Sequence, residues 1–105
     1  MSVLSITFHC PENNLEVWDK YVDETLALLA ENLMEVDQYI LSEVDSDMLQ
    51  EGKNYNLLLV FANKELREQF LENEMRNIEE RVHDRFGDQI MIFTTLLNPR
   101  KTRKQ

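Results

Sequence analysis

The sequence predicts an α+β domain in which a four-stranded antiparallel sheet packs against two helices. Four apolar runs have the length and residue pattern of β-strands. Two longer stretches carry apolar residues three or four positions apart, which is typical of amphipathic helices. Between Val3 and Leu97 these elements follow the order strand, helix, strand, strand, helix, strand. This order indicates two β-α-β units combined in one sheet.

The first half of the chain predicts a strand over residues 3–10 and a helix from Asn14 to about Leu33. Apolar residues of the strand alternate with a second set of side chains, Val3, Ser5, Thr7 and His9. Strict alternation places the apolar set on one face of the sheet, namely Leu4, Ile6, Phe8 and Cys10. The residues Asn13 to Glu16 resemble a capping box, which predicts a side-chain cap at the start of the helix.

The second half predicts strands over residues 36–44 and 55–62, with a loop between them, then a helix and a last strand. The strand over 55–62 is apolar on both faces, as expected for a strand that is covered on both sides. Asn63 is predicted to cap the second helix and Gly87 to end it. The last strand spans 89–97, and Pro99 follows it.

Right-handed crossovers arrange these strands in the order 4-1-3-2, with both helices on one face of the sheet. This is the ferredoxin-like βαββαβ sandwich. Nothing within the chain covers the other face, although its strands offer apolar side chains to it, and such a face favours a partner. We predict a homodimer through this face. The candidate interface residues are Leu58, Val60, Met91 and Phe93. Leu59 is placed in the core because it shares its face with Tyr55, Leu57 and Phe61.

Length and charge indicate one acidic domain, residues 1–98, followed by a basic tail, residues 99–105, that we expect to be disordered. The net charge is −9, although four basic residues, Arg100, Lys101, Arg103 and Lys104, lie in the last six positions. An acidic body disfavours nucleic acid and anionic membranes as partners. No apolar run approaches the ~20 residues that a membrane span needs, and no signal peptide is recognisable. A single cysteine agrees with a reducing compartment, so a cytoplasmic location is expected.

The sequence contains no evident catalytic, metal or cofactor motif. His9 and Cys10 are adjacent on a strand and point to opposite faces, so they cannot form a catalytic dyad. Two histidines and one cysteine, on three separate elements, show no zinc spacing, and only two glycines are present. We therefore expect no metal and no cofactor. The arginines of the second helix alternate with acidic residues, which predicts a solvated face for all four, Arg67, Arg76, Arg81 and Arg85.

The weak candidates for ligand binding are His9, Ser5 and Thr7, which share the face of the first strand that the helices leave open. An apolar ligand would suit the Leu, Met and Phe side chains expected around them. An RNA-binding alternative has the same element order. However, the aromatic and glycine signature of that class is not matched by the segment 53–59, and the charge is of the wrong sign.

The segment Met34 to Val44 and the Asn98-Pro99 pair followed by a basic tail resemble a small uncharacterised family. Its members are single-domain bacterial proteins, mostly from Bacteroidota, with a ferredoxin-like fold related to dimeric α/β barrels. The resemblance implies this fold and a bacterial cytoplasmic setting. The topology is also similar to dimeric α/β-barrel monooxygenases of the antibiotic-biosynthesis type, but no catalytic residue set matches. Two functions stay open: a homodimeric binding or interaction module, or a small-molecule-binding protein or enzyme with a pocket between facing sheets.

Overall fold

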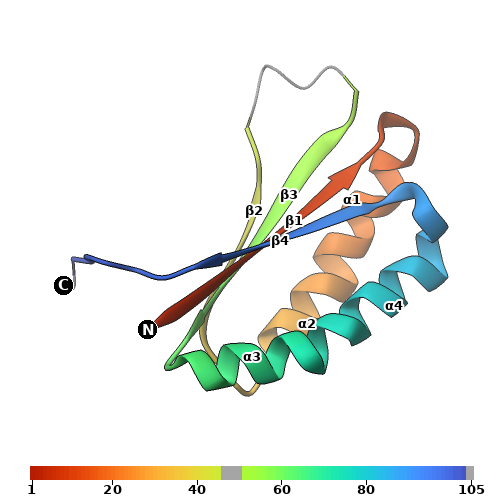
Figure 1. Cartoon of the computed structure of the whole chain (residues 1–105). Coiled ribbons are helices and arrows are strands. Elements are labelled where there is room, and N and C mark those ends of the chain that lie inside the picture. The colour runs from red at the N-terminus through yellow and green to blue at the C-terminus, as the bar shows by residue number, and fades with distance from the viewer. Residues whose placement is uncertain (46–50, 104–105) are drawn as a thin grey trace.

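The computed structural model describes residues 1–45 and 51–103, which form one antiparallel sheet with all helices on one of its faces (Figure 1). The strands are β1 (Ser2–Cys10), β2 (Val36–Glu43), β3 (Lys53–Phe61) and β4 (Met91–Leu97). They lie in the order β2-β3-β1-β4, and each neighbouring pair is antiparallel. This is the predicted order 4-1-3-2 read from the other edge, so the ferredoxin-like βαββαβ prediction is confirmed. Part of the predicted loop after β2, residues 46–50, lies outside the described residues.

The helical layer consists of two segments that cross between strands. The first contains η1 (Glu12–Asn14), α1 (Leu15–Tyr21), the π-helical turn η2 (Val22–Leu26) and α2 (Ala27–Glu31). The second contains α3 (Lys64–Glu72), α4 (Glu74–Phe86) and the short η3 (Gly87–Gln89). None of the described helices is long and apolar enough to cross a membrane.

The first helical segment differs from the prediction at its start and in its middle. No side chain caps it, so the capping-box prediction is wrong. Instead, a 3₁₀ turn leads in, with the Asn14 N–H donating to the Pro11 carbonyl oxygen at 3.1 Å. The buried residues Trp18, Val22 and Leu26 are four positions apart. Because an ideal helix has 3.6 residues per turn, such a repeat drifts around its surface, and one wider π turn returns it to the sheet.

The second helical segment was predicted as one helix but is divided at Asn73. The predicted Asn63 cap is confirmed, since its side-chain oxygen accepts a hydrogen bond from the Leu66 N–H at 2.9 Å. At the division, the Asn73 side chain donates to the Gln69 carbonyl oxygen at 3.1 Å. A side chain that bonds to the backbone four residues earlier competes with the helix, and α4 starts again at Glu74.

The core lies between the sheet and the helices, and the predicted sidedness of the strands is confirmed. The buried strand residues are Leu4, Ile6, Phe8 and Cys10 on β1 with Tyr55, Leu57, Leu59 and Phe61 on β3. Trp18 is fully buried at the centre of an aromatic group, and its ring centroid lies 5.5 Å from that of Phe8 and 5.2 Å from that of Phe86. These rings fix α1 and the end of α4 against the sheet.

Arg67 is a correction to the prediction that all four arginines of the second segment are solvated. Its side chain is 1% exposed. Nη1 donates to the carbonyl oxygens of Val3 at 3.0 Å and Leu97 at 2.9 Å, and Nη2 donates to Asn98 Oδ1 at 3.1 Å. The planar guanidinium thereby joins the start of β1 to the end of β4. Charge alternation along the sequence does not distinguish this role from a solvated one.

Gly52, just before β3, is expected to tolerate alanine poorly. It has φ +103°, and an added Cβ would overlap the Cys10 carbonyl oxygen, whereas Gly87 has φ +62° with open space around it. Gly52→Ala should lower the free energy of unfolding by roughly 2–4 kcal/mol, and Gly87→Ala by about 1 kcal/mol, in urea denaturation. Equal losses of unfolding free energy in the two variants would contradict the close approach of the Gly52 and Cys10 backbones.

Candidate functional site

The face of the sheet that carries no helix is defined here as the open face (Figure 1). Strand alternation and the pairing register identify its residues. They are Gln38, Ile40 and Ser42 on β2, Asn54, Asn56, Leu58 and Val60 on β3, Val3, Ser5, Thr7 and His9 on β1, and Met91, Phe93, Thr95 and Leu97 on β4. All four predicted interface residues therefore lie on one surface.

The open face differs in composition from the rest of the chain. None of the residues that the register places on it is Asp, Glu, Lys or Arg, although 30% of the chain is charged. Asp37, at the bulge of β2, has no register partner and is assigned to neither face. Its β4 edge exposes large apolar side chains, with Met91 52% and Phe93 51% exposed. Leu58 and Val60 on β3 are half-buried. An uncharged surface with exposed aromatic and aliphatic groups is typical of a surface that is covered by a partner.

Polar side chains on β1 and β3 form a hydrogen-bonded cluster within the open face. Asn56 Nδ2 donates to Ser5 Oγ at 2.7 Å and to Thr7 Oγ1 at 3.3 Å. His9 Nδ1 lies 2.7 Å from Asn54 Oδ1. We call these five residues the polar cluster. The structure thus brings the predicted candidates His9, Ser5 and Thr7 together and adds two asparagines that sequence reasoning did not select.

The two asparagines carried a signal that could have identified them. In the segment 53–59 they alternate with Tyr55 and Leu57, so they had to share the face of Leu58. What the sequence did not supply was the pairing of β3 with β1, which sets Asn54 opposite His9 and Asn56 opposite Thr7. Without this register, the asparagines could not be assigned to the same site as the β1 candidates.

Cys10 lies on the other side of β1 from the polar cluster, as alternation predicted. Its side chain is buried, and Sγ lies 3.4 Å from the Pro11 carbonyl oxygen. Burial raises the pKa of the Cys10 thiol to about 11, so the nucleophilic thiolate is disfavoured at neutral pH. Cys10 is therefore a core residue, and His9 forms its contacts on the opposite face.

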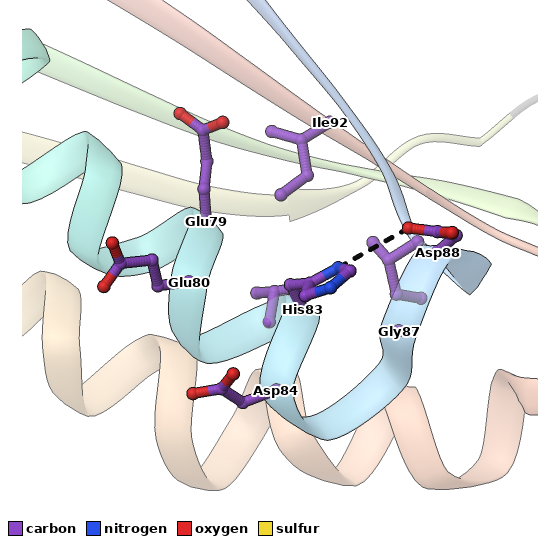
Figure 2. Close-up of a pocket in the computed structure, with 9 residues that line it drawn as sticks. Glu79, Glu80, His83, Asp84, Gly87, Asp88 and Ile92 are labelled. Carbon is purple, nitrogen blue, oxygen red and sulfur yellow. Dashed lines mark ion pairs between the residues drawn. The ribbon is translucent and has the colours of Figure 1, made fainter.

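A separate hollow of about 460 Å³ lies between α4 and the start of β4 (Figure 2). Its lining includes four acidic residues, Glu79, Glu80, Asp84 and Asp88, and the apolar side chain of Ile92. His83, placed by the sequence in the last turn of the helix, has Nδ1 3.5 Å from Asp88 Oδ1. Within the described residues, no group of three or more His, Cys, Asp or Glu side chains is arranged to hold a metal ion.

Three solved structures share this fold over almost the whole chain. An ethyl tert-butyl ether D (EthD) family protein from Bacillus halodurans C-125 is 13% identical, with 90% of this chain and 97% of that chain covered and a TM-score of 0.68. A dimeric ferredoxin-like protein from an uncultured marine organism is 13% identical, with both chains covered to 100% and a TM-score of 0.68. A Bacillus cereus protein, provisionally assigned as an antibiotic biosynthesis monooxygenase, is 10% identical, with 99% and 97% covered and a TM-score of 0.61.

At these identities the three structures show the fold alone. No curated protein matches the sequence. A protein-family profile matches residues 1–99, and the family is described as a domain of unknown function, DUF4286.

Proposed function

The chain belongs to the DUF4286 family, and we propose that it is a homodimeric binding or interaction module. In this proposal two copies of the chain meet through their open faces. The observation that carries the proposal is the lack of Asp, Glu, Lys and Arg on the open face of a chain that is 30% charged. Charged side chains are depleted where a protein surface becomes buried in an interface. A structural neighbour that is described as dimeric, with both chains covered to 100%, supports a dimer.

The dimer is tested by placing a charge on the open face. Phe93→Glu should convert a dimer into a folded monomer in sedimentation experiments, because a carboxylate facing an apolar partner surface has no counter-ion. Val17→Glu on α1 is the matched control, since Val17 is 49% exposed and Phe93 is 51% exposed. The control variant should remain a dimer. A monomeric wild-type protein, or a dimeric Phe93→Glu variant, would refute the proposal.

The second candidate function is a small-molecule-binding protein or enzyme with its pocket between the facing sheets. The polar cluster favours it, because a few convergent polar groups within apolar surroundings are typical of ligand sites. One structural neighbour is provisionally assigned as a monooxygenase. An apolar ligand that protects the dimer against dissociation would support this alternative over a pure interaction module.

The proposed setting is the bacterial cytoplasm, with neither nucleic acid nor a membrane surface as partner. A lone cysteine has no internal disulfide to form, and a net charge of −9 disfavours polyanions. Single-stranded RNA should therefore show no micromolar binding at physiological salt.

Residues 99–105 are proposed to be a tail that adds no stability to the domain. Its described residues are exposed, and the last side chain bound by Arg67 is Asn98, before Pro99. Deletion of residues 100–105 should leave the Tm unchanged within about 1 °C in a thermal melt. A fall of several degrees would show that the tail docks on the domain.

A further inference from the structure

The polar cluster has hydrogen-bonding groups that its own contacts leave available. His9 Nδ1 lies 2.7 Å from Asn54 Oδ1, and because an amide oxygen only accepts, Nδ1 carries the hydrogen. In the neutral imidazole, Nε2 is then the acceptor. This tautomer leaves the Nε2 lone pair free of the Asn54 contact.

The two hydroxyls of the cluster accept hydrogen bonds from Asn56, whereas His9 Nδ1 donates one to Asn54. Asn56 Nδ2 directs its hydrogens to Ser5 Oγ and Thr7 Oγ1, so both hydroxyl oxygens act as acceptors in these bonds. Each hydroxyl hydrogen is therefore available to donate to another group. Successive outward residues of a strand are about 7 Å apart, so β1 presents an acceptor at His9 and donors at Thr7 and Ser5 in one row.

The surroundings of this row restrict the ligand that would fit it. On β4, Met91 is the partner of His9 and Phe93 is the partner of Thr7, and both side chains are about half exposed. An aromatic ring and a thioether beside a polar row suit a flat apolar molecule. Because the open face carries no Asp, Glu, Lys or Arg, a cationic ligand enclosed there would have no counter-ion, and an anionic ligand would meet only His9, which is neutral in this tautomer.

We propose that the polar cluster binds an uncharged, flat, mainly apolar ligand of the phenol or enol class. The ligand hydroxyl donates to His9 Nε2, an oxygen acceptor elsewhere on the ligand is bound by Thr7 or Ser5, and its ring lies against Phe93. Asn54 is a positioning residue that keeps the His9 hydrogen on Nδ1. The inference rests on the proposed dimer, in which a second open face encloses the ligand.

The test compares 2-naphthol with 2-methoxynaphthalene, in which a methyl group replaces the hydroxyl hydrogen, by NMR titration of the full chain. We expect 2-naphthol to bind about tenfold more tightly, as one hydrogen bond to an enclosed acceptor provides, and to shift the His9 ring resonances. The preference should disappear in His9→Phe and in the second variant His9→Leu, neither of which has an acceptor, and weaken in Asn54→Leu. His83→Gln, which changes the other histidine, should retain it.

Equal affinity for the two probes, or binding that leaves the His9 resonances unchanged, would overturn the inference. Sedimentation of the same samples separates this failure from failure of the dimer. A dimer that does not discriminate between the probes refutes the ligand site alone. A monomer that still discriminates through His9 refutes the facing-sheet dimer and retains the ligand class.

Discussion

Leu59→Asp is expected to abolish folding, whereas Leu58→Asp is expected to give a folded, soluble monomer. The two leucines are adjacent on β3 and point to opposite faces of the sheet. Leu59 is 0% exposed in the core, where an unpaired carboxylate costs several kcal/mol, comparable with the whole stability of a small domain. Leu58 lies on the open face between Ile40 and Ser5, so its charge would act on the partner contact.

Circular dichroism and sedimentation distinguish the two results. Leu59→Asp should lose the far-UV signal of the native protein or aggregate, and Leu58→Asp should keep that signal at half the mass of the wild type. Leu58→Ala and Leu59→Ala control for the loss of side-chain volume without an added charge. If both Asp variants remain folded dimers, the face of Leu59 is not the core and the face of Leu58 is not the dimer interface.

Arg67→Ala is expected to lower the free energy of unfolding by roughly 2–4 kcal/mol. The variant removes three hydrogen bonds from a charged donor and leaves the buried Val3 carbonyl without its Arg67 partner. Loss of the buried charge offsets part of this cost, since Arg67 has no acidic partner within 4 Å among the described residues. Urea denaturation measures the difference.

Two further substitutions separate the contributions of Arg67. Arg67→Met keeps most of the volume but no donor, so it should be less destabilised than Arg67→Ala and still less stable than the wild type. Arg76→Ala changes an exposed arginine of α4 and should stay within about 0.5 kcal/mol. A Met variant as stable as the wild type would show that the hydrogen bonds contribute nothing net.

The sequence was sufficient for the features that depend on local periodicity. Alternation along β1 predicted which side chains enter the core, and crossover handedness predicted the strand order. Local pattern was insufficient where a contact between distant residues decides the outcome. In the sequence, Arg67 has the same pattern of acidic neighbours as the exposed arginines. Only the tertiary structure places it beside the ends of β1 and β4. Asn54 becomes part of a site only when the register places it opposite His9.

The helix irregularities were missed for a different reason. The π turn Val22–Leu26 and the division at Asn73 adjust the helical segments to a sheet whose shape the helical sequence does not encode. A periodic stripe predicts that a helix exists, but small departures from its spacing are absorbed by the backbone in ways that depend on packing.

Because β1 and β4 are antiparallel neighbours and Val3 pairs with Leu97, the first strand begins at the same end of the sheet at which the last strand ends (Figure 1). The start of β1 and the end of β4 therefore lie next to each other, and the Arg67 side chain bonds to both. A short linker could join the two ends and a new break could be opened in an exposed turn without changing any strand neighbour. His9 and Met91 lie at the other end of the same two strands, so additions at either terminus start far from His9.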